Sequence, residues 1–388
     1  MIQDQLELLR QNLMRCKETI GHPAVDIKLR ERVAARFDQQ LAQLQAAYET
    51  LKRKVTNGQP LEPCWRELGD LQRDSDRVFG ECLVFIHGAL ARNANLDEDI
   101  CKFTDDLLDD LAKYSDVPWG RFTLLATSEF YLDIAEIIRI RYPELSLWSL
   151  PLAAHEFGHY LDQRLHEKKG GDFTYPSQDM LKAASKKAPD QLHDQNWYHL
   201  QEHFADLFAT YALGPAYAAA FILLRMNPAG AQDDMPSHPS GAKRVHGILR
   251  VLDKMDARQA TPFERPFHAV TARLREIWQT GLSGAGKAEK LPNVQASLIN
   301  QQMDQLLELL IAHSPPQLMF GRADFSRAQQ MAAQWMNGAP AMAIAPEGLT
   351  RRDVLNGAWL ARLDPAADQS PYALNAIVSR ASVEYRNR

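Results

Sequence analysis

Two histidines four residues apart, with a glutamate directly after the first, are the residues of this chain best suited to chemistry. They are His155, Glu156 and His159, within Ala-Ala-His-Glu-Phe-Gly-His-Tyr-Leu. On a helix, residues i and i+4 lie on one face, so both imidazoles can bind one metal ion beside the Glu156 carboxylate. Neutral imidazole suits zinc, and an adjacent carboxylate can take a proton from zinc-bound water. The pattern predicts a hydrolytic zinc site; the alternative is a buried helix with two satisfied histidines.

A pair of acidic residues later in the chain can complete this site. Glu202 and Asp206 are four residues apart, so they share a helix face. A catalytic zinc has three protein ligands and leaves its fourth position to water, which predicts Glu202 as the third ligand. Asp206 can then accept a hydrogen bond from the far nitrogen of a ligand histidine. The alternatives are a solvated acidic pair, or His203 as the third ligand, about 100° around the helix from Glu202.

A proline-rich segment after these acids carries another candidate histidine. His238 lies in Met-Pro-Ser-His-Pro, and the following Pro239 favours an extended backbone at His238. We expect His238 to project from a loop and donate a hydrogen bond to the oxyanion that develops during hydrolysis. Arg244 begins the next predicted helix and is expected to brace that loop through an ion pair. The alternative is a surface loop whose histidine has no catalytic role.

These three segments, in this order, resemble those of the gluzincin zinc metallopeptidases. The resemblance rests on His155-Glu156-x-x-His159 followed by Glu202-x-x-x-Asp206. The segment 237–245 is similar to the His-Pro…Arg element of the CAAX prenyl endopeptidase branch, and the whole resemblance covers about 122–252. It implies one zinc per chain and hydrolysis of peptide bonds. A second similar family, the cytoplasmic metallopeptidases that cleave phage-type repressors, shares the His-Glu-Phe-Gly-His helix but does not explain the later His-Pro.

Composition limits the classes of protein to which this chain can belong. The net charge of −5 and the isoelectric point near 6.2 give no basis for nucleic-acid binding. Four scattered cysteines without C-x-x-C spacing, and an N-terminus without an apolar signal-peptide core, predict a cytoplasmic protein. The apolar run 207–224 approaches the length of a membrane span. Gly214-Pro215 interrupts it, so we expect a buried helix pair there. The membrane members of the CAAX prenyl endopeptidase branch carry several spanning helices, and without such helices prenylated substrates are not expected for this chain.

Periodicity predicts a mainly α-helical chain with an N-terminal helical region 1–116 and a C-terminal helical region 259–388. The motifs and the family resemblance imply a zinc metallopeptidase core over 117–258 between them. The acids of 97–110 are expected on a solvated helix face. The expected elements are a helix over 33–51, a turn at 57–60, a strand at 121–131, a helix over 134–140, a loop over 170–196, and helices over 262–280, 294–313, 325–336 and 349–363.

Together these patterns predict a soluble protein with a gluzincin-like catalytic core and a small β-sheet beside the metal-binding helix. Glu156 would act as general base on a water that zinc activates, and a protein or peptide substrate would lie along the sheet edge. Two other classes stay open: a regulatory protease specific for one repressor or toxin-like protein, and a non-catalytic helical scaffold stabilised by zinc. The sequence does not predict the oligomeric state.

Overall fold

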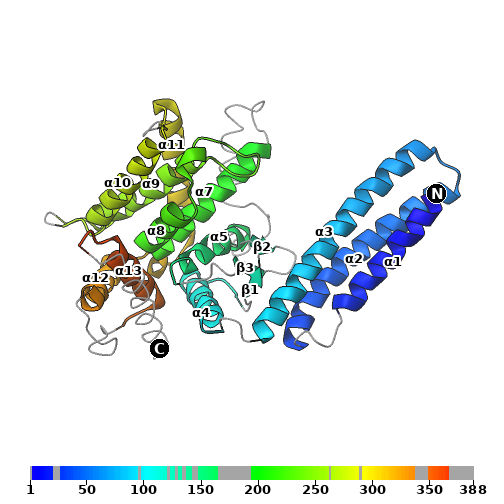
Figure 1. The fold of residues 1–388 in the computed structure, drawn as a ribbon, viewed down its shortest axis with the longest axis horizontal. Coiled ribbons are helices and arrows are strands. Elements are labelled where there is room, and N and C mark those ends of the chain that lie inside the picture. The colour runs from blue at the N-terminus through cyan, green and yellow to red at the C-terminus, as the bar shows by residue number, and fades with distance from the viewer. Residues whose placement is uncertain are drawn as a thin grey trace. The chain divides into compact units, whose positions relative to one another are not determined.

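The chain forms two compact units, which are described separately (Figure 1). The first unit is Met1–Cys101 with Arg121–Pro143, and the second is Lys102–Gly120 with Glu144–Arg388. The computed structural model describes residues 2–20, 27–94, 98–119, 123–126, 130–132, 137–141, 147–164, 194–261, 264–287, 291–336 and 348–366. These units do not follow the predicted borders near 116 and 258, and the three predicted regions stay a prediction about domains.

Three long helices build most of the first unit. They are α1 (Ile2–Ile20), α2 (Ile27–Thr56) and α3 (Leu61–Asn93), and each packs against the other two (Figure 1). The helix predicted over 33–51 lies within α2, and the predicted turn follows it, where Gly58 adopts a positive φ of 71°. Leucines at three- and four-residue spacing form the core of the bundle, as the periodicity predicted. The core includes Leu6, Leu9, Leu13, Leu41, Leu44, Tyr48, Leu51, Leu68 and Leu71.

A small sheet accompanies this bundle and corrects two predictions. Its strands are β1 (Thr123–Ala126), β2 (Phe130–Leu132) and β3 (Ile137–Arg141), in the order β1-β3-β2. The single strand predicted over 121–131 is therefore wrong, because β1 and β2 divide it. The helix predicted over 134–140 is also wrong, because β3 occupies part of it. The isoleucines of β3 favour a strand, and parallel pairing with β1 and antiparallel pairing with β2 satisfy its backbone.

The sheet belongs to the first unit. Arg92 on α3 donates to the carbonyl oxygen of Thr123 on β1 at 2.7 Å, and α3 packs against β1. The predicted metal-binding helix belongs to the second unit. The expected position of the sheet edge beside that helix therefore stays a prediction.

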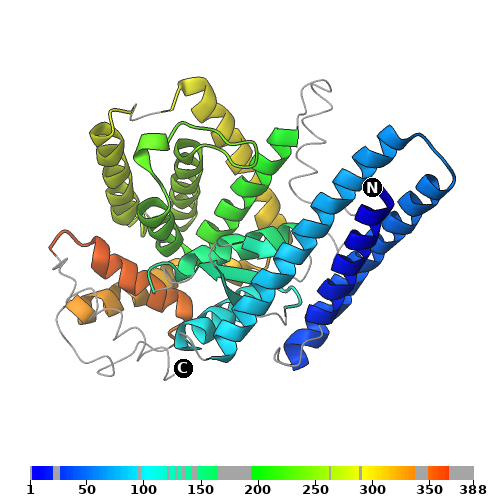
Figure 2. The ribbon, with the colours of Figure 1, turned by 45° about the vertical axis from the view of Figure 1, so that its right-hand side comes forward.

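The second unit is a layered assembly of helices around α7 (Asp194–Leu213) and α5 (Ala153–Arg164), which pack against each other (Figures 1 and 2). The other helices of this unit are α8 (Pro215–Leu224), α9 (Gly241–Gln259), α10 (His268–Gly284), α11 (Asn293–His313), α12 (Arg322–Met336), α13 (Arg351–Leu363) and most of α4 (Glu98–Ser115). Helices α9 and α11 pack against α7, and α8 packs against α13. The predicted C-terminal helices are confirmed as α10 to α13, although the first begins later than expected.

The apolar run 207–224 forms a buried helix pair, as predicted, with the end of α7 and α8 on either side of Gly214. Gly214 has a φ of 60°, and a Cβ there would lie 2.4 Å from the ring of Phe320. Asn356 on α13 fixes this break: its amide donates to the carbonyl of Leu213 and accepts from the backbone of Ala216. None of the helices in the described part of the chain is long and apolar enough to cross a membrane.

The acidic helix α4 differs in part from its prediction. Asp106 and Asp110 were expected on a solvated face, but both lie in ion pairs with Arg351 of α13, at 3.4 and 2.5 Å. These pairs join helices more than two hundred residues apart in the sequence. The loop predicted over 170–196 lies mostly outside the described residues, and α7 begins within it, at Asp194.

Candidate metal centre

Helix α5 is held against α7 by a cluster of aromatic rings, and both motif histidines lie close to Glu202 of α7. Phe157 and Tyr160 are fully buried, and both make edge contacts with Trp119, at centroid distances of 5.2 and 5.0 Å. Phe157 also packs against Phe208 of α7, with centroids 5.7 Å apart. A 3₁₀ turn at Leu150–Leu152 leads into α5.

Gly158, between the two histidines, permits a close approach of α5 and α7. A Cβ at Gly158 would lie 2.8 Å from the Cα of Ala205 and 3.1 Å from its carbonyl oxygen. Real Cβ atoms are not found at such distances from backbone, so only glycine fits here without a shift of one helix. Ala205 follows Glu202 by three residues on α7. The contact therefore sets the distance between α5 and α7 at the level of the candidate metal ligands.

The three predicted metal ligands converge between these helices. His155, His159 and Glu202 each offer a donor atom, and the three atoms lie within 4.8 Å of one another. The two Nε2 atoms are 3.2 Å apart, and each lies 3.4 Å from one oxygen of the Glu202 carboxylate. This cluster could hold a metal ion. His203, the rival third ligand, is buried and is not part of the cluster found among the described residues.

The candidate ligands His155 and Glu202 are held in place by further side chains around them. His155 Nδ1 lies 3.0 Å from Asp206 Oδ1, so this ring nitrogen donates to the carboxylate and Nε2 faces the cluster. Arg244 on α9 donates two hydrogen bonds to Asp206, both at 2.8 Å, and its Nη1 lies 3.2 Å from Glu202 Oε2. Tyr217 on α8 donates to the same Asp206 carboxylate at 2.5 Å, and its ring stacks on His155. The predicted orienting role of Asp206 thus has a matching geometry.

The electrostatic balance of the centre favours a cation. Burial would raise the pKa of Glu202 and of Asp206, but Arg244 and the histidines hold both pKa values well below their usual range. Burial would lower the pKa of His155, whereas hydrogen bonds and charge from the two carboxylates raise it to about 10. With His155 neutral, as a metal ligand must be, two ionised carboxylates against one guanidinium leave the donors with a net negative charge, so the field that raises the pKa of His155 also favours a metal cation.

One buried oxygen atom without a hydrogen bond supports the same conclusion. Glu202 Oε2 is buried and has no hydrogen bond in the described part of the chain, although Arg244 lies nearby. A buried carboxylate oxygen without a donor is costly unless another positive group occupies its open side. Two imidazoles and one carboxylate form the donor set of catalytic zinc, so these residues fit that metal.

Glu156 and His238 lie at the edge of the centre. Glu156 follows His155 on α5 and is partly exposed, and no hydrogen bond or ion pair of its side chain is found among the described residues. His238 Nε2 lies 3.5 Å from Glu202 Oε1, and 51% of the His238 side chain is exposed. The structure therefore brings His238 close to Glu202, and the catalytic role of His238 stays a prediction.

Arg244 does not brace the His238 loop as predicted; other residues hold it. Asp234 accepts from the backbone of Ser240 at 2.7 Å and from Lys243 at 2.5 Å. The backbones of Met235 and His238 bond to each other, and His199 on α7 bonds to the carbonyl oxygen of Met235 at 2.8 Å. Arg244 instead braces the acids of α7.

Sequence reasoning missed Tyr217 and Asp234. Tyr217 lies in the apolar run, where its ring is typical of a core aromatic. Its hydroxyl group was the signal that the sequence offered, because a buried hydroxyl group needs a hydrogen-bond partner, here Asp206. Asp234 precedes the start of α9 by seven residues, and its side chain bonds to the backbone at that start, which is typical of acids near a helix N-terminus.

Comparison of the chain with protein-family models, with curated proteins and with solved structures finds no match.

Proposed function

We propose that this chain is a zinc-dependent metallopeptidase that hydrolyses peptide bonds in a protein or peptide substrate. The observation that carries the proposal is the convergence of His155, His159 and Glu202 from two helices, with donor atoms within 4.8 Å. A partly exposed Glu156 directly follows one ligand, which is the place that a general base requires. The negative charge of the centre adds support, because it suits a divalent cation.

The donor set points to zinc with an open position for water. Two histidines and one glutamate leave the fourth position of a tetrahedral site free, whereas structural zinc sites are closed by four protein ligands. When bound there, zinc would lower the pKa of a water molecule and polarise the substrate carbonyl group. The presence of Glu156 also favours catalysis, since a structural site has no use for a base.

The residues of the chain divide the work of hydrolysis. Asp206 holds the proton on His155 Nδ1 and so keeps Nε2 available as a ligand atom, while Arg244 holds Asp206 and Glu202 in place. Glu156 takes a proton from the attacking water and delivers it to the leaving amine. His238, at the exposed edge of the centre, donates a hydrogen bond to the oxyanion of the tetrahedral intermediate.

Metal analysis and one isosteric substitution test the proposal together. Protein purified without added metal is expected to carry zinc, and Glu156→Gln is expected to keep both the fold and the zinc while turnover falls by orders of magnitude. Glu202→Ala should lose zinc, and His203→Ala is the matched control that should retain it. Iron or no transition metal in the purified protein, or unchanged hydrolysis by Glu156→Gln, would contradict the proposal.

Substrate tests separate the two remaining alternatives. A general peptidase is expected to cleave casein or members of a peptide library, and a chelator should stop it. A regulatory protease specific for one repressor or toxin-like protein would leave both largely intact yet cleave its own target in a Glu156-dependent manner. A zinc-stabilised scaffold would cleave nothing and would lose its fold with its metal.

A further inference from the structure

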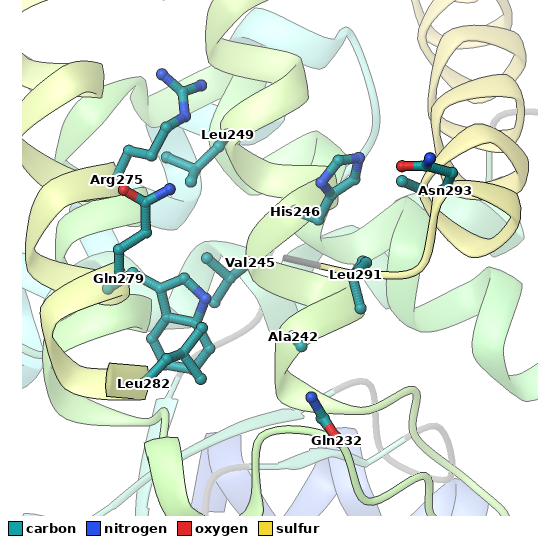
Figure 3. Close-up of a pocket in the computed structure, with 12 residues that line it drawn as sticks. Gln232, Ala242, Val245, His246, Leu249, Arg275, Gln279, Leu282, Leu291 and Asn293 are labelled. Carbon is teal, nitrogen blue, oxygen red and sulfur yellow. The ribbon is translucent and has the colours of Figure 1, made fainter. Parts of the chain in front are cut away.

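A separate cavity lies on another side of α9, between α10 and the start of α11 (Figure 3). Its volume is about 270 Å³. None of the predicted metal ligands, nor Glu156 or His238, lines it. Its lining consists of Gln232, Ala242, Val245, His246, Leu249, Arg275, Trp278, Gln279, Leu282, Leu291, Asn293 and Ala296.

The base of the cavity is apolar. Val245, Leu249, Trp278 and Leu282 are buried side chains of α9 and α10, and all four line the cavity. An apolar cavity of roughly 150 Å³ is known to accept benzene, so a cavity of about 270 Å³ has room for one ring with polar substituents. The apolar base therefore selects a ring or a branched chain of that size.

The rim of the cavity is polar and offers both donors and acceptors. Arg275 donates one hydrogen bond to Asp253 at 2.9 Å, and a guanidinium has five N–H donors, so this bond does not exhaust it. His246 Nε2 lies 3.0 Å from Asn300 Oδ1, which makes Nε2 the donor and leaves Nδ1 as an acceptor. Figure 3 shows Arg275 and Gln279 on α10, across the cavity from Asn293 at the start of α11.

We propose that this cavity binds a free apolar amino acid. The ring or branched side chain would occupy the apolar base against Trp278 and Leu249. The carboxylate would bind Arg275 and Gln279, and the amino group would bind Nδ1 of His246 and the Asn293 amide oxygen. A purely apolar molecule would make no use of the remaining N–H donors of Arg275 or of the Nδ1 acceptor of His246. The proposal does not rest on the metallopeptidase function, because the two sites share no lining residue.

Calorimetric titration of the intact protein with L-phenylalanine, L-leucine and phenylalaninol tests the proposal. The two amino acids are expected to bind saturably below about 10 mM, and phenylalaninol, which lacks the carboxylate, should bind more weakly. Arg275→Gln should weaken binding of L-phenylalanine about tenfold or more and leave that of phenylalaninol nearly unchanged, because a charged hydrogen bond is lost. Arg273→Gln is the matched control on the same helix, since Arg273 pairs with Glu276 and does not line the cavity.

A second variant places the binding site in the cavity. Gln279→Trp would fill the mouth with an indole ring at a partly exposed position, and it should abolish binding while circular dichroism shows an intact fold. The proposal is overturned if neither amino acid gives saturable heat, if Arg275→Gln binds L-phenylalanine as wild type does, or if a folded Gln279→Trp still binds it. Each outcome is independent of zinc content and of peptide hydrolysis.

Discussion

At the residue scale, a glycine sets how closely the two helices of the candidate metal centre approach each other. Gly158 is one of the two variable positions of the His-Glu-x-x-His motif, yet a Cβ there would lie 2.8 Å from the Cα of Ala205. The metal ligands need this contact because they come from both helices, and their donor atoms must lie within a few ångströms. The site therefore depends on a residue that has no chemistry of its own.

Substitution of this glycine should loosen the centre. Gly158→Ala is expected to lower the free energy of unfolding by roughly 1–3 kcal/mol and to weaken zinc binding, because the added methyl group overpacks a backbone contact. Gly69→Ala in α3 is the matched control, since a Cβ there meets open space; it should stabilise the protein by about 0.5–1 kcal/mol. Urea unfolding and zinc titration measure both effects. Wild-type zinc affinity in Gly158→Ala would show that the close approach is not required.

At the element scale, the loop between α8 and α9 is a structured support for His238. Asp234 joins the loop to the start of α9, and His199 joins it to α7, the helix that carries Glu202. The loop is thus fixed at both sides of the centre. His238 can then keep a constant position relative to the ligands although half of its side chain is exposed.

Loss of this support should resemble loss of the histidine itself. On a cleaved substrate, His238→Ala is expected to keep zinc, to change KM little and to lower kcat by roughly 10²–10³, the usual cost of one oxyanion donor. Asp234→Ala should lower kcat less than His238→Ala does. Combined with His238→Ala it should lower kcat little further, because both substitutions act through the His238 imidazole. Asp233→Ala, the exposed neighbour, is the control. Additive losses in the double variant would mean that Asp234 does not act through His238.

At the scale of the whole molecule, the candidate metal centre lies within a unit whose core is packed by side chains other than the candidate ligands. The aromatic cluster around Phe157 holds α5 against α7, and Asn356 of α13 ties the break between α7 and α8. Arg244 also keeps the acids of α7 paired. These contacts would persist after loss of a cation, so the fold and the metal are separable.

Removal of the metal should therefore weaken the protein without unfolding it. At a zinc concentration of about 100 Kd, binding would add about 2.7 kcal/mol, so a chelator is expected to lower Tm by about 5–10 °C. Far-UV circular dichroism at 25 °C should keep its helical signal. Readdition of zinc should restore Tm, with the Glu202→Ala variant as the control that does not respond. Collapse of the helical signal on chelation would favour the scaffold alternative.

The sequence by itself determined the local parts of this protein. Helical periodicity predicted α2 and the helices after α9, and i, i+4 spacing put His155 with His159 and Glu202 with Asp206 on shared faces. These features depend on backbone geometry over a few residues, which composition and spacing report directly. The buried helix pair around Gly214 followed from the same kind of local signal.

Only the tertiary structure decided which of these faces meet. Residues 137–141 form a strand, and not the predicted helix, because β1 and β2 supply partners for its backbone. Tyr217 and Arg244 reach Asp206 from two further helices, and Arg351 reaches the acids of α4 from across the chain. Such contacts depend on the packing of segments that are distant in the sequence. Which helices pack together depends on side-chain volume and on close backbone contacts such as that of Gly158 with Ala205.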